Sequence, residues 1–187
     1  MARSDRNDRE GMEMRKFAAR PVAEEEHALF RAMYSLYLHD LSEFTDFYQL
    51  DADGEWAPDY LPTWLDRSNP DVRPFLFWLD ETPIGFALVG AKPFPYMSAG
   101  IDYRMSEFFI ARGHRRGGLG RAAAEQVFEM LQGTWEIVQL PENQVATTFW
   151  LNVVERFTGG RFVSDTLDGE ARQRFASGAA VLAETSA

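Results

Sequence analysis

The sequence predicts an α/β fold (α+β in some schemes) with a mixed, mostly antiparallel central sheet of about six to seven strands flanked by helices. Three observations predict it. Strand-like apolar runs alternate with helical stripes over residues 13–176, and hairpin turns stand near both ends of the sheet-forming region. The chain of 187 residues is 45% hydrophobic, which is enough for one sizeable core. We therefore expect a single domain over residues 13–176.

The amino-terminal third begins with a short strand predicted over Met14–Ala19 and a helix from Glu24 to about Phe44. The acidic residues 24–26 complement the positive end of a helix dipole. Apolar residues then recur at helical spacing: Leu29, Phe30, Met33, Tyr34, Tyr37, Leu38 and Leu41. Asp51–Gly54 has the residue types of a loop, and Pro58–Leu65 predicts a second, shorter helix.

Two aromatic-rich runs, Val72–Leu79 and Ile84–Val89, are separated by Asp80–Pro83, which has the length and residue types of a hairpin turn. These runs predict antiparallel neighbours. Ile101–Ala111 is the next extended run, and the alanine-rich segment Ala122–Leu131 has strong helix propensity. A strand, a glycine-rich turn and a helix therefore follow one another here.

The carboxyl-terminal part repeats this alternation. Thr134–Leu140 predicts a strand, and Asn143–Phe157 carries an apolar stripe at helical spacing. Arg161–Thr166 and Gln173–Ala176 then predict a terminal hairpin around Leu167–Gly169. These elements complete the predicted sheet.

Both ends of the chain differ from this pattern. Residues 1–12 are charged and poor in large apolar side chains, so we expect a disordered tail, and residues 177–187 predict a flexible carboxyl-terminal end. No apolar run approaches the roughly 20 residues of a membrane span, and the polar start lacks the apolar core of a signal peptide. We expect a cytoplasmic protein that does not associate with membranes.

The composition excludes several classes of function. The formal net charge of −10 argues against nucleic acid or an anionic membrane surface as the main partner and favours a small or cationic substrate. The chain has no cysteine, which excludes thiolate nucleophiles, iron–sulfur clusters and cysteine-type zinc sites. We expect no bound metal.

The turn over residues 112–121 holds four of the 19 basic residues and no acid, inside a chain that is otherwise negative. Gly117, Gly118 and Gly120 let the backbone approach a ligand closely, while the following helix adds its positive dipole end. Two linked phosphates fit such a turn. An ordinary loop at a helix start is the alternative, whereas the P-loop and the dinucleotide-binding fingerprint are both absent.

Two motifs resemble those of the GNAT superfamily of N-acetyltransferases. The first is Gln/Arg-x-x-Gly-x-Gly/Ala between the fourth strand and the third helix, and the second is Asn-x-x-Ala-x-x-Phe-Tyr in the next helix. The matching residues are Arg115, Gly118 and Gly120 in the first motif, and Asn143, Ala146, Phe149 and Trp150 in the second. The resemblance covers roughly residues 101–165 and implies acetyl-CoA as cosubstrate. It also implies a splay between the fourth and fifth strands.

The resemblance further implies where the cofactor binds. Backbone groups of residues 115–121 would hold the pyrophosphate, the end of the fourth strand would pair with the pantetheine arm, and Asn143 would donate or accept a cofactor hydrogen bond. The implied cofactor-binding residues are Phe108, Phe109, Ile110, Arg115, Arg116, Gly117, Gly118, Leu119, Gly120, Arg121, Asn143, Phe149 and Trp150.

For catalysis, acetyl transfer requires a base that accepts a proton from the amine. Glu107 is our candidate, directly or through a water, because its apolar neighbours on the fourth strand suggest that it faces the ligand cleft; an exposed strand position is the alternative. Asp102 and Tyr103 are fallback candidates, and His114 is expected beside phosphate in solvent. Trp150 stands where many members of the superfamily have the tyrosine that protonates the leaving thiolate, and indole is no such acid.

We therefore expect an N-acetyltransferase that moves the acetyl group of acetyl-CoA to a primary amine of a small molecule or peptide, by direct attack in a ternary complex. A non-catalytic acyl-CoA-binding or regulatory module and a phosphate-binding structural domain are the alternatives. Acids and aromatic residues between Glu43 and Asp66 line an acceptor site for a cation or form an ordinary solvated face. The sequence leaves a homodimer open.

Overall fold

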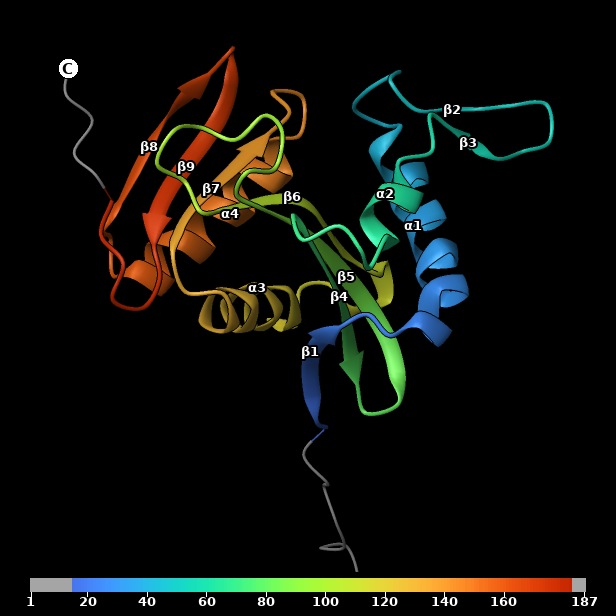
Figure 1. Ribbon diagram of the computed structural model, residues 1–187, viewed down its shortest axis with the longest axis horizontal. Coiled ribbons are helices and arrows are strands. Elements are labelled where there is room, and N and C mark those ends of the chain that lie inside the picture. Colours follow the sequence, from blue (N-terminus) through green and yellow to red (C-terminus); the bar gives the residue numbers. More distant parts are fainter. Residues whose placement is uncertain (1–14, 183–187) are drawn as a thin grey trace, which may run out of the picture.

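The computed structural model describes residues 15–182, and its centre is a seven-stranded sheet (Figure 1). In spatial order the strands are β1 (Phe17–Pro21), β4 (Val72–Leu79), β5 (Thr82–Ala91), β6 (Tyr103–Ile110), β7 (Thr134–Gln139), β9 (Glu170–Ala176) and β8 (Phe162–Leu167). Only β6 and β7 pair in parallel, and every other neighbouring pair is antiparallel. The predicted mixed, mostly antiparallel sheet is confirmed.

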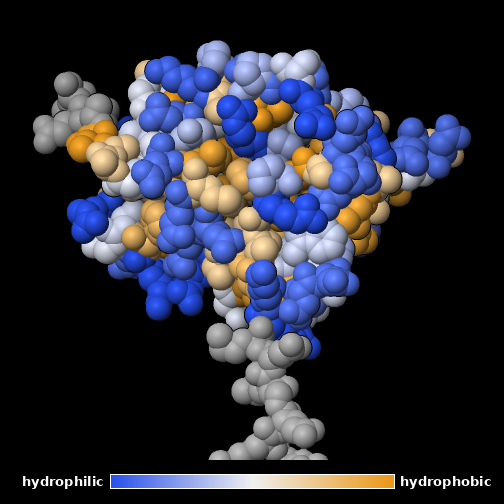
Figure 2. Space-filling view, turned by 60° about the horizontal axis from the view of Figure 1, so that its bottom comes forward, coloured by the Kyte–Doolittle hydropathy of each residue, from blue (hydrophilic) through white to orange (hydrophobic). Residues whose placement is uncertain are grey.

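Helices cover both faces of the sheet (Figure 1). On one face lie α1 (His27–Leu41), which follows a 3-10 turn at Glu24–Glu26, and the single-turn helix α2 (Leu61–Leu65). On the other face lie α3 (Leu119–Met130) and α4 (Gln144–Thr158). Each face buries its own cluster of apolar side chains, with α1 and α2 packed in one and α3 and α4 in the other. In Figure 2, apolar side chains reach the surface as a broken band bordered by hydrophilic ones.

Several element boundaries differ from the predictions. The first strand begins at Phe17, after Lys16 donates its backbone N–H to the Asp80 carboxylate. The first helix ends at Leu41, where the Ser42 hydroxyl bonds to the backbone of the last turn. A small hairpin of β2 (Gln49–Leu50) and β3 (Trp56–Ala57) was not predicted, because two-residue strands carry no measurable periodicity.

The parallel pair β6 and β7 separates soon after it begins. Tyr103–Met105 pairs with Trp135–Ile137, but the remainder of β6 has no strand partner on that side among residues 15–182. The Asp102 carboxylate fixes the closed end by accepting hydrogen bonds from the Thr134 N–H at 2.9 Å and the Thr134 hydroxyl at 2.8 Å. The implied splay between the fourth and fifth strands of the family fold is therefore present.

Ser177 corrects one boundary of the domain. The expected flexible end starts at this residue, but Ser177 is only 2% exposed. Its hydroxyl accepts hydrogen bonds from the Gly133 N–H and the Trp135 indole N–H, both at 3.1 Å, so this residue belongs to the packed domain. The predicted tail over residues 1–12, the first two residues of the predicted domain and residues 183–187 of the predicted end lie outside the described residues. Within residues 15–182, no helix is long and apolar enough to cross a membrane.

Candidate active site

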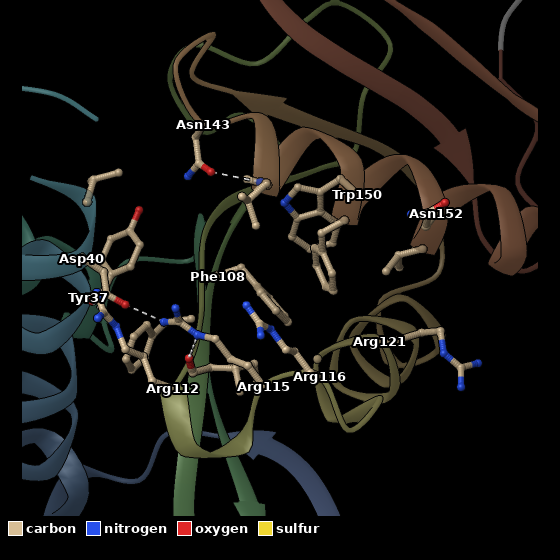
Figure 3. Close-up of a pocket in the computed structure, with 18 of the residues that line it drawn as sticks. Tyr37, Asp40, Phe108, Arg112, Arg115, Arg116, Arg121, Asn143, Trp150 and Asn152 are labelled. Carbon is tan, nitrogen blue, oxygen red and sulfur yellow. Dashed lines mark hydrogen bonds and ion pairs between the residues drawn. The ribbon is translucent and has the colours of Figure 1, made fainter. Parts of the chain in front are cut away.

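A cleft of about 1020 Å³ opens beside the unpaired end of β6. The strand end, the following turn and α3 form its floor, while α4 lies on one side and α1 on the other (Figure 3). The residues implied as cofactor ligands that line it are Phe108, Phe109, Ile110, Arg115, Arg116, Gly118, Gly120, Arg121, Asn143, Phe149 and Trp150. Gly117 and Leu119 lie in the same turn but are not among the lining residues.

The start of α3 is built to expose backbone N–H groups. Gly118 is the N-cap with a φ of 81°, in the left-handed region that favours glycine, and it provides no side-chain cap. A Cβ at Gly117 or Gly118 would meet nothing within 4 Å, so the space beside the turn is open. A Cβ at Gly120 would lie 3.3 Å from the Phe149 ring. The uncapped end of a 12-residue helix therefore faces the cleft and suits an anion.

The four arginines of the turn have different roles. Arg112 and Arg115 both bind the Asp40 carboxylate of α1, at 2.8 and 2.5 Å. Arg121 lies 3.6 Å from Glu125 and points away from Phe108 in Figure 3. Arg116 makes no hydrogen bond or ion pair to any residue within 15–182, and its side chain extends toward Phe108 in the cleft (Figure 3). Of these four guanidinium groups, that of Arg116 is thus the one best placed for a phosphate.

The unpaired edge of β6 offers backbone groups to a ligand. The Ala111 N–H donates to the Ile84 carbonyl of β5 at 2.8 Å, so by alternation the backbone groups of Phe108 and Ile110 point to the other, open side. The Ile110 carbonyl already accepts a 2.6 Å hydrogen bond from Arg115 Nε. The Ile110 N–H and both backbone groups of Phe108 are left to pair with an extended, amide-containing ligand.

The α4 side of the cleft is aromatic. Phe149 and Trp150 contact the Phe108 ring with centroid distances of 5.8 and 5.0 Å, and Trp150 is 6% exposed. Asn143 begins the helix by accepting the Ala146 N–H on Oδ1 at 3.0 Å. Its amide nitrogen is then the group that can reach a ligand.

Glu107 lies on the α1 face of the sheet. Ser106 is an extra residue in β6, since Leu88 pairs with Glu107 and Val89 with Met105, and this bulge determines the face that Glu107 occupies. The Tyr37 hydroxyl donates a hydrogen bond to the Glu107 carboxylate. Burial raises the pKa of Glu107 to about 7, although the Tyr37 hydrogen bond and the charge of Arg104 act in the opposite direction.

Tyr37, not Glu107, lines the cleft. Burial and the neighbouring Glu107 charge raise the pKa of the Tyr37 phenol well above its ordinary value, so the phenol keeps its proton near neutral pH. The predicted base therefore stands one side chain behind the cleft wall, with a hydroxyl group between it and the ligand space. A carboxyl group with a pKa near 7 is well matched to proton transfer at neutral pH.

The fallback candidates are placed elsewhere. The Asp102 carboxylate is bonded to Thr134 at the closed end of the splay, and hydrogen bonds from that residue, against some burial, hold its pKa below the ordinary value. The Tyr103 ring packs 5.1 Å from Trp135. His114 lies in the 3-10 turn Arg112–His114 and is not among the residues lining the cleft. None of the three is in position to act on a ligand there.

Two residues of the site have no sequence motif. Tyr37 and Asp40 both line the cleft from α1, and their spacing of three positions places them on one side of that helix. In the sequence, only this helical spacing and the polar groups on an otherwise apolar stripe indicate Tyr37 and Asp40.

No group of three or more histidines and acids within residues 15–182 is arranged to hold a metal ion.

The fold and the cleft together define an acyltransferase of the GNAT class. The chain belongs to the acetyltransferase (GNAT) family, whose family model matches residues 31–152. No curated protein sequence matched the chain.

Solved structures support the same fold. An acetyltransferase from Thermus thermophilus has a TM-score of 0.61 and 19% identity, with 86% of this chain and 97% of that chain covered. A GNAT-family acetyltransferase from Streptococcus pneumoniae has a TM-score of 0.56 and 16% identity, covering 87% and 100%. The aminoglycoside acetyltransferase AAC(6')-Ib, in complex with coenzyme A and kanamycin, has a TM-score of 0.57 and 19% identity, covering 86% and 95%. At these identities the similarity establishes the fold.

Proposed function

We propose that this protein transfers the acetyl group of acetyl-CoA to a primary amine of a small molecule or peptide, by direct attack in a ternary complex. The observation that carries the proposal is the continuity of the cleft: the unpaired β6 edge leads directly to the uncapped start of α3. A similar fold holds coenzyme A together with an aminoglycoside in AAC(6')-Ib. We also place the protein in the cytoplasm.

The residues of the cleft fit the parts of this cosubstrate. The N–H groups at the start of α3 and the guanidinium of Arg116, which extends into the cleft, would hold the pyrophosphate. The open backbone groups of Phe108 and Ile110 would pair with the pantetheine amides, as a neighbouring strand would. Phe149 and Trp150 provide apolar packing along the arm, and the Asn143 amide offers a further donor.

When bound, acetyl-CoA supplies a thioester carbonyl that a neutral amine attacks. Glu107 accepts the proton of the amine, and because the carboxylate lies behind Tyr37, the proton passes through the phenol or a bridging water. Trp150 holds no proton that it can give to the leaving thiolate, so that proton comes from water, from another side chain or from the acceptor ammonium. Side chains of α1 and α4 line the cleft on either side of the proposed arm and would limit the access of bulk water to the attack.

The acceptor side of the protein is strongly acidic. Residues 43–66 contain seven acids and neither lysine nor arginine, and Glu43 among them lines the cleft. This charge raises the local concentration of cations and favours a cationic amine over an anionic acceptor. Small amines, aminoglycoside-like polyamines and peptide amino termini all satisfy that requirement.

The first experiment separates cofactor binding from catalysis. Coenzyme A is expected to raise the melting temperature in a concentration-dependent way, whereas ATP and NAD are not, since they lack the pantetheine arm. Thiol release from acetyl-CoA across a panel of amines then tests transfer. Equal stabilisation by all three nucleotides would contradict the cofactor assignment.

Trp150 favours a second candidate, a non-catalytic acyl-CoA-binding module, because the chain lacks a proton donor at that position. Stabilisation by coenzyme A without thiol release for any amine, at pH values above 7 where Glu107 is ionised, would favour the module over the enzyme.

A further inference from the structure

One carboxylate ties α1 to the cofactor turn. Asp40 Oδ1 accepts hydrogen bonds from Arg112 Nε and Nη2 at 3.2 and 2.8 Å, and Asp40 Oδ2 accepts one from Arg115 Nη2 at 2.5 Å (Figure 3). The Asp40 side chain is 20% exposed. Burial raises its pKa, but the two arginines outweigh that effect and hold the pKa below the ordinary value. The Asp40 charge is therefore retained at neutral pH.

The position of Asp40 is unfavourable for the helix itself. Asp40 is the penultimate residue of α1, where the negative end of the helix dipole repels a carboxylate. The two arginines come from another element and offset that repulsion. An acid at this unfavourable helix position, stabilised by two arginines from a loop distant in sequence, indicates that Asp40 contributes to the tertiary arrangement rather than to the stability of α1.

The same end of α1 carries the residue that holds the candidate base. Tyr37 lies three positions before Asp40, and its hydroxyl donates to Glu107. Phe109 provides a second connection, because the Tyr37 ring packs edge-on against it at 6.2 Å and the Arg115 guanidinium lies 5.6 Å from the same ring. The cofactor turn and the Tyr37–Glu107 pair are thus joined through one helical turn and one aromatic ring.

We propose that Asp40 is a positioning residue, which couples the cofactor turn to the Tyr37–Glu107 pair by holding the end of α1 against Arg112 and Arg115. This inference rests on the proposed function for its catalytic meaning. The link from Arg112 and Arg115 through Asp40 to the Tyr37–Glu107 pair is a property of the protein alone and does not depend on that function. Without Asp40 the end of α1 is released, and the Tyr37 hydroxyl no longer stays on the Glu107 carboxylate.

The direct test uses the protein without cofactor. A carbon-13 NMR titration of the Glu107 side-chain carboxyl is expected to show a higher pKa in Asp40→Asn than in the wild type, because the Tyr37 hydrogen bond lowers that pKa. The other groups that act on Glu107 are Arg104 of β6 and the buried phenols of Tyr34 and Tyr48, and these stay unchanged. Beside Asp40 itself, His39 lies at 4.0 Å and is left intact.

Tyr37→Phe completes a double-mutant cycle. It is expected to raise the Glu107 pKa to at least the same extent, and the double variant is expected to show no further increase, because Asp40 acts through Tyr37. Glu24→Gln is the matched control: it removes an exposed ion pair with Arg67 near the other end of α1 and is expected to leave the titration unchanged.

Kinetics supply the catalytic readout. Asp40→Asn is expected to lower kcat roughly tenfold, which lies within the range of coupling between residues of one hydrogen-bonded network. The acid limb of the pH profile is expected to move to higher pH, and the KM for acetyl-CoA is expected to change less. An unshifted Glu107 titration in Asp40→Asn, with only the melting temperature lowered, would overturn the inference. If the wild type binds no coenzyme A, the proposed function fails, while the titration still tests the link.

Discussion

Replacing Glu107 by Gln is expected to remove the acid limb of the pH–rate profile while leaving the fold intact. The substitution keeps the size of the side chain and can still accept the Tyr37 hydrogen bond. It deletes a carboxyl group beside the cleft whose pKa, raised to about 7 by burial, falls in the range where the enzyme would work. Activity and stability should therefore respond differently to this change.

The magnitude for activity follows from that pKa. If the ionised form is required, the wild-type kcat/KM falls about tenfold for each pH unit below 7, or roughly 90-fold between pH 8 and pH 5. A positioned base contributes about 10² to 10⁴ in rate. The rate of Glu107→Gln at pH 8 is expected to be lower than that of the wild type by this factor, and its pH–rate profile should show no acid limb due to residue 107.

The stability effect has the opposite sign. The carboxyl pKa is raised from 4.5 to about 7 in the folded state, so the folded protein binds more protons than the unfolded chain between these values. The favourable contribution is fully present below pH 4.5 and is lost as the pH rises through 7. At pH 8, the free energy of unfolding of Glu107→Gln should thus equal that of the wild type or exceed it by up to about 3 kcal/mol. At pH 5 the two proteins should differ less.

The assay measures thiol release at saturating acetyl-CoA with an accepted amine, at each half unit from pH 5 to pH 8. Urea unfolding at pH 5 and pH 8 provides the stability comparison. If Glu107→Gln keeps the wild-type acid limb and rate, the base assignment is wrong. If the variant is instead much less stable than wild type at pH 8, the inferred pKa shift is wrong.

Three further predictions concern the cleft. Arg116→Gln is expected to raise the Kd for coenzyme A by roughly 10- to 100-fold, the value of a charged hydrogen bond, whereas Arg121→Gln should have a smaller effect. Isothermal titration calorimetry measures both affinities, and equal losses would contradict the assignment of Arg116 to the phosphate. Gly120→Val is expected to weaken coenzyme A binding by at least about tenfold, because its Cβ would already lie 3.3 Å from Phe149; unchanged affinity in the same titration would argue against a tight contact. Asn143→Ala is expected to lower stability by about 1 kcal/mol through loss of the α4 cap, which urea unfolding detects, and a neutral result would show that the cap is replaced by solvent.

Local sequence patterns predicted most of the fold correctly. The glycine turn and the helix after it depend on backbone freedom and helix propensity within a few residues, so Gly118 could be assigned to the turn from the sequence. The β2–β3 hairpin was missed because its strands have two residues each. The pairing of the Asp102 carboxylate with Thr134, which removes a fallback base, spans 32 positions and left no local pattern.

The sequence by itself determined the order of elements, the place of the glycine-rich turn and the positions of the residues that match the family motifs, since these depend on neighbours along the chain. Only the tertiary structure decided the partners of the arginines and the face of the sheet on which Glu107 lies. Arg115 is bound by Asp40, 75 positions away, whereas Arg116 makes no hydrogen bond or ion pair to any residue within 15–182. The bulge at Ser106 sets the face on which Glu107 meets Tyr37, 70 positions away. Because one extra residue in a strand reverses every following side chain, alternation alone could not decide that face.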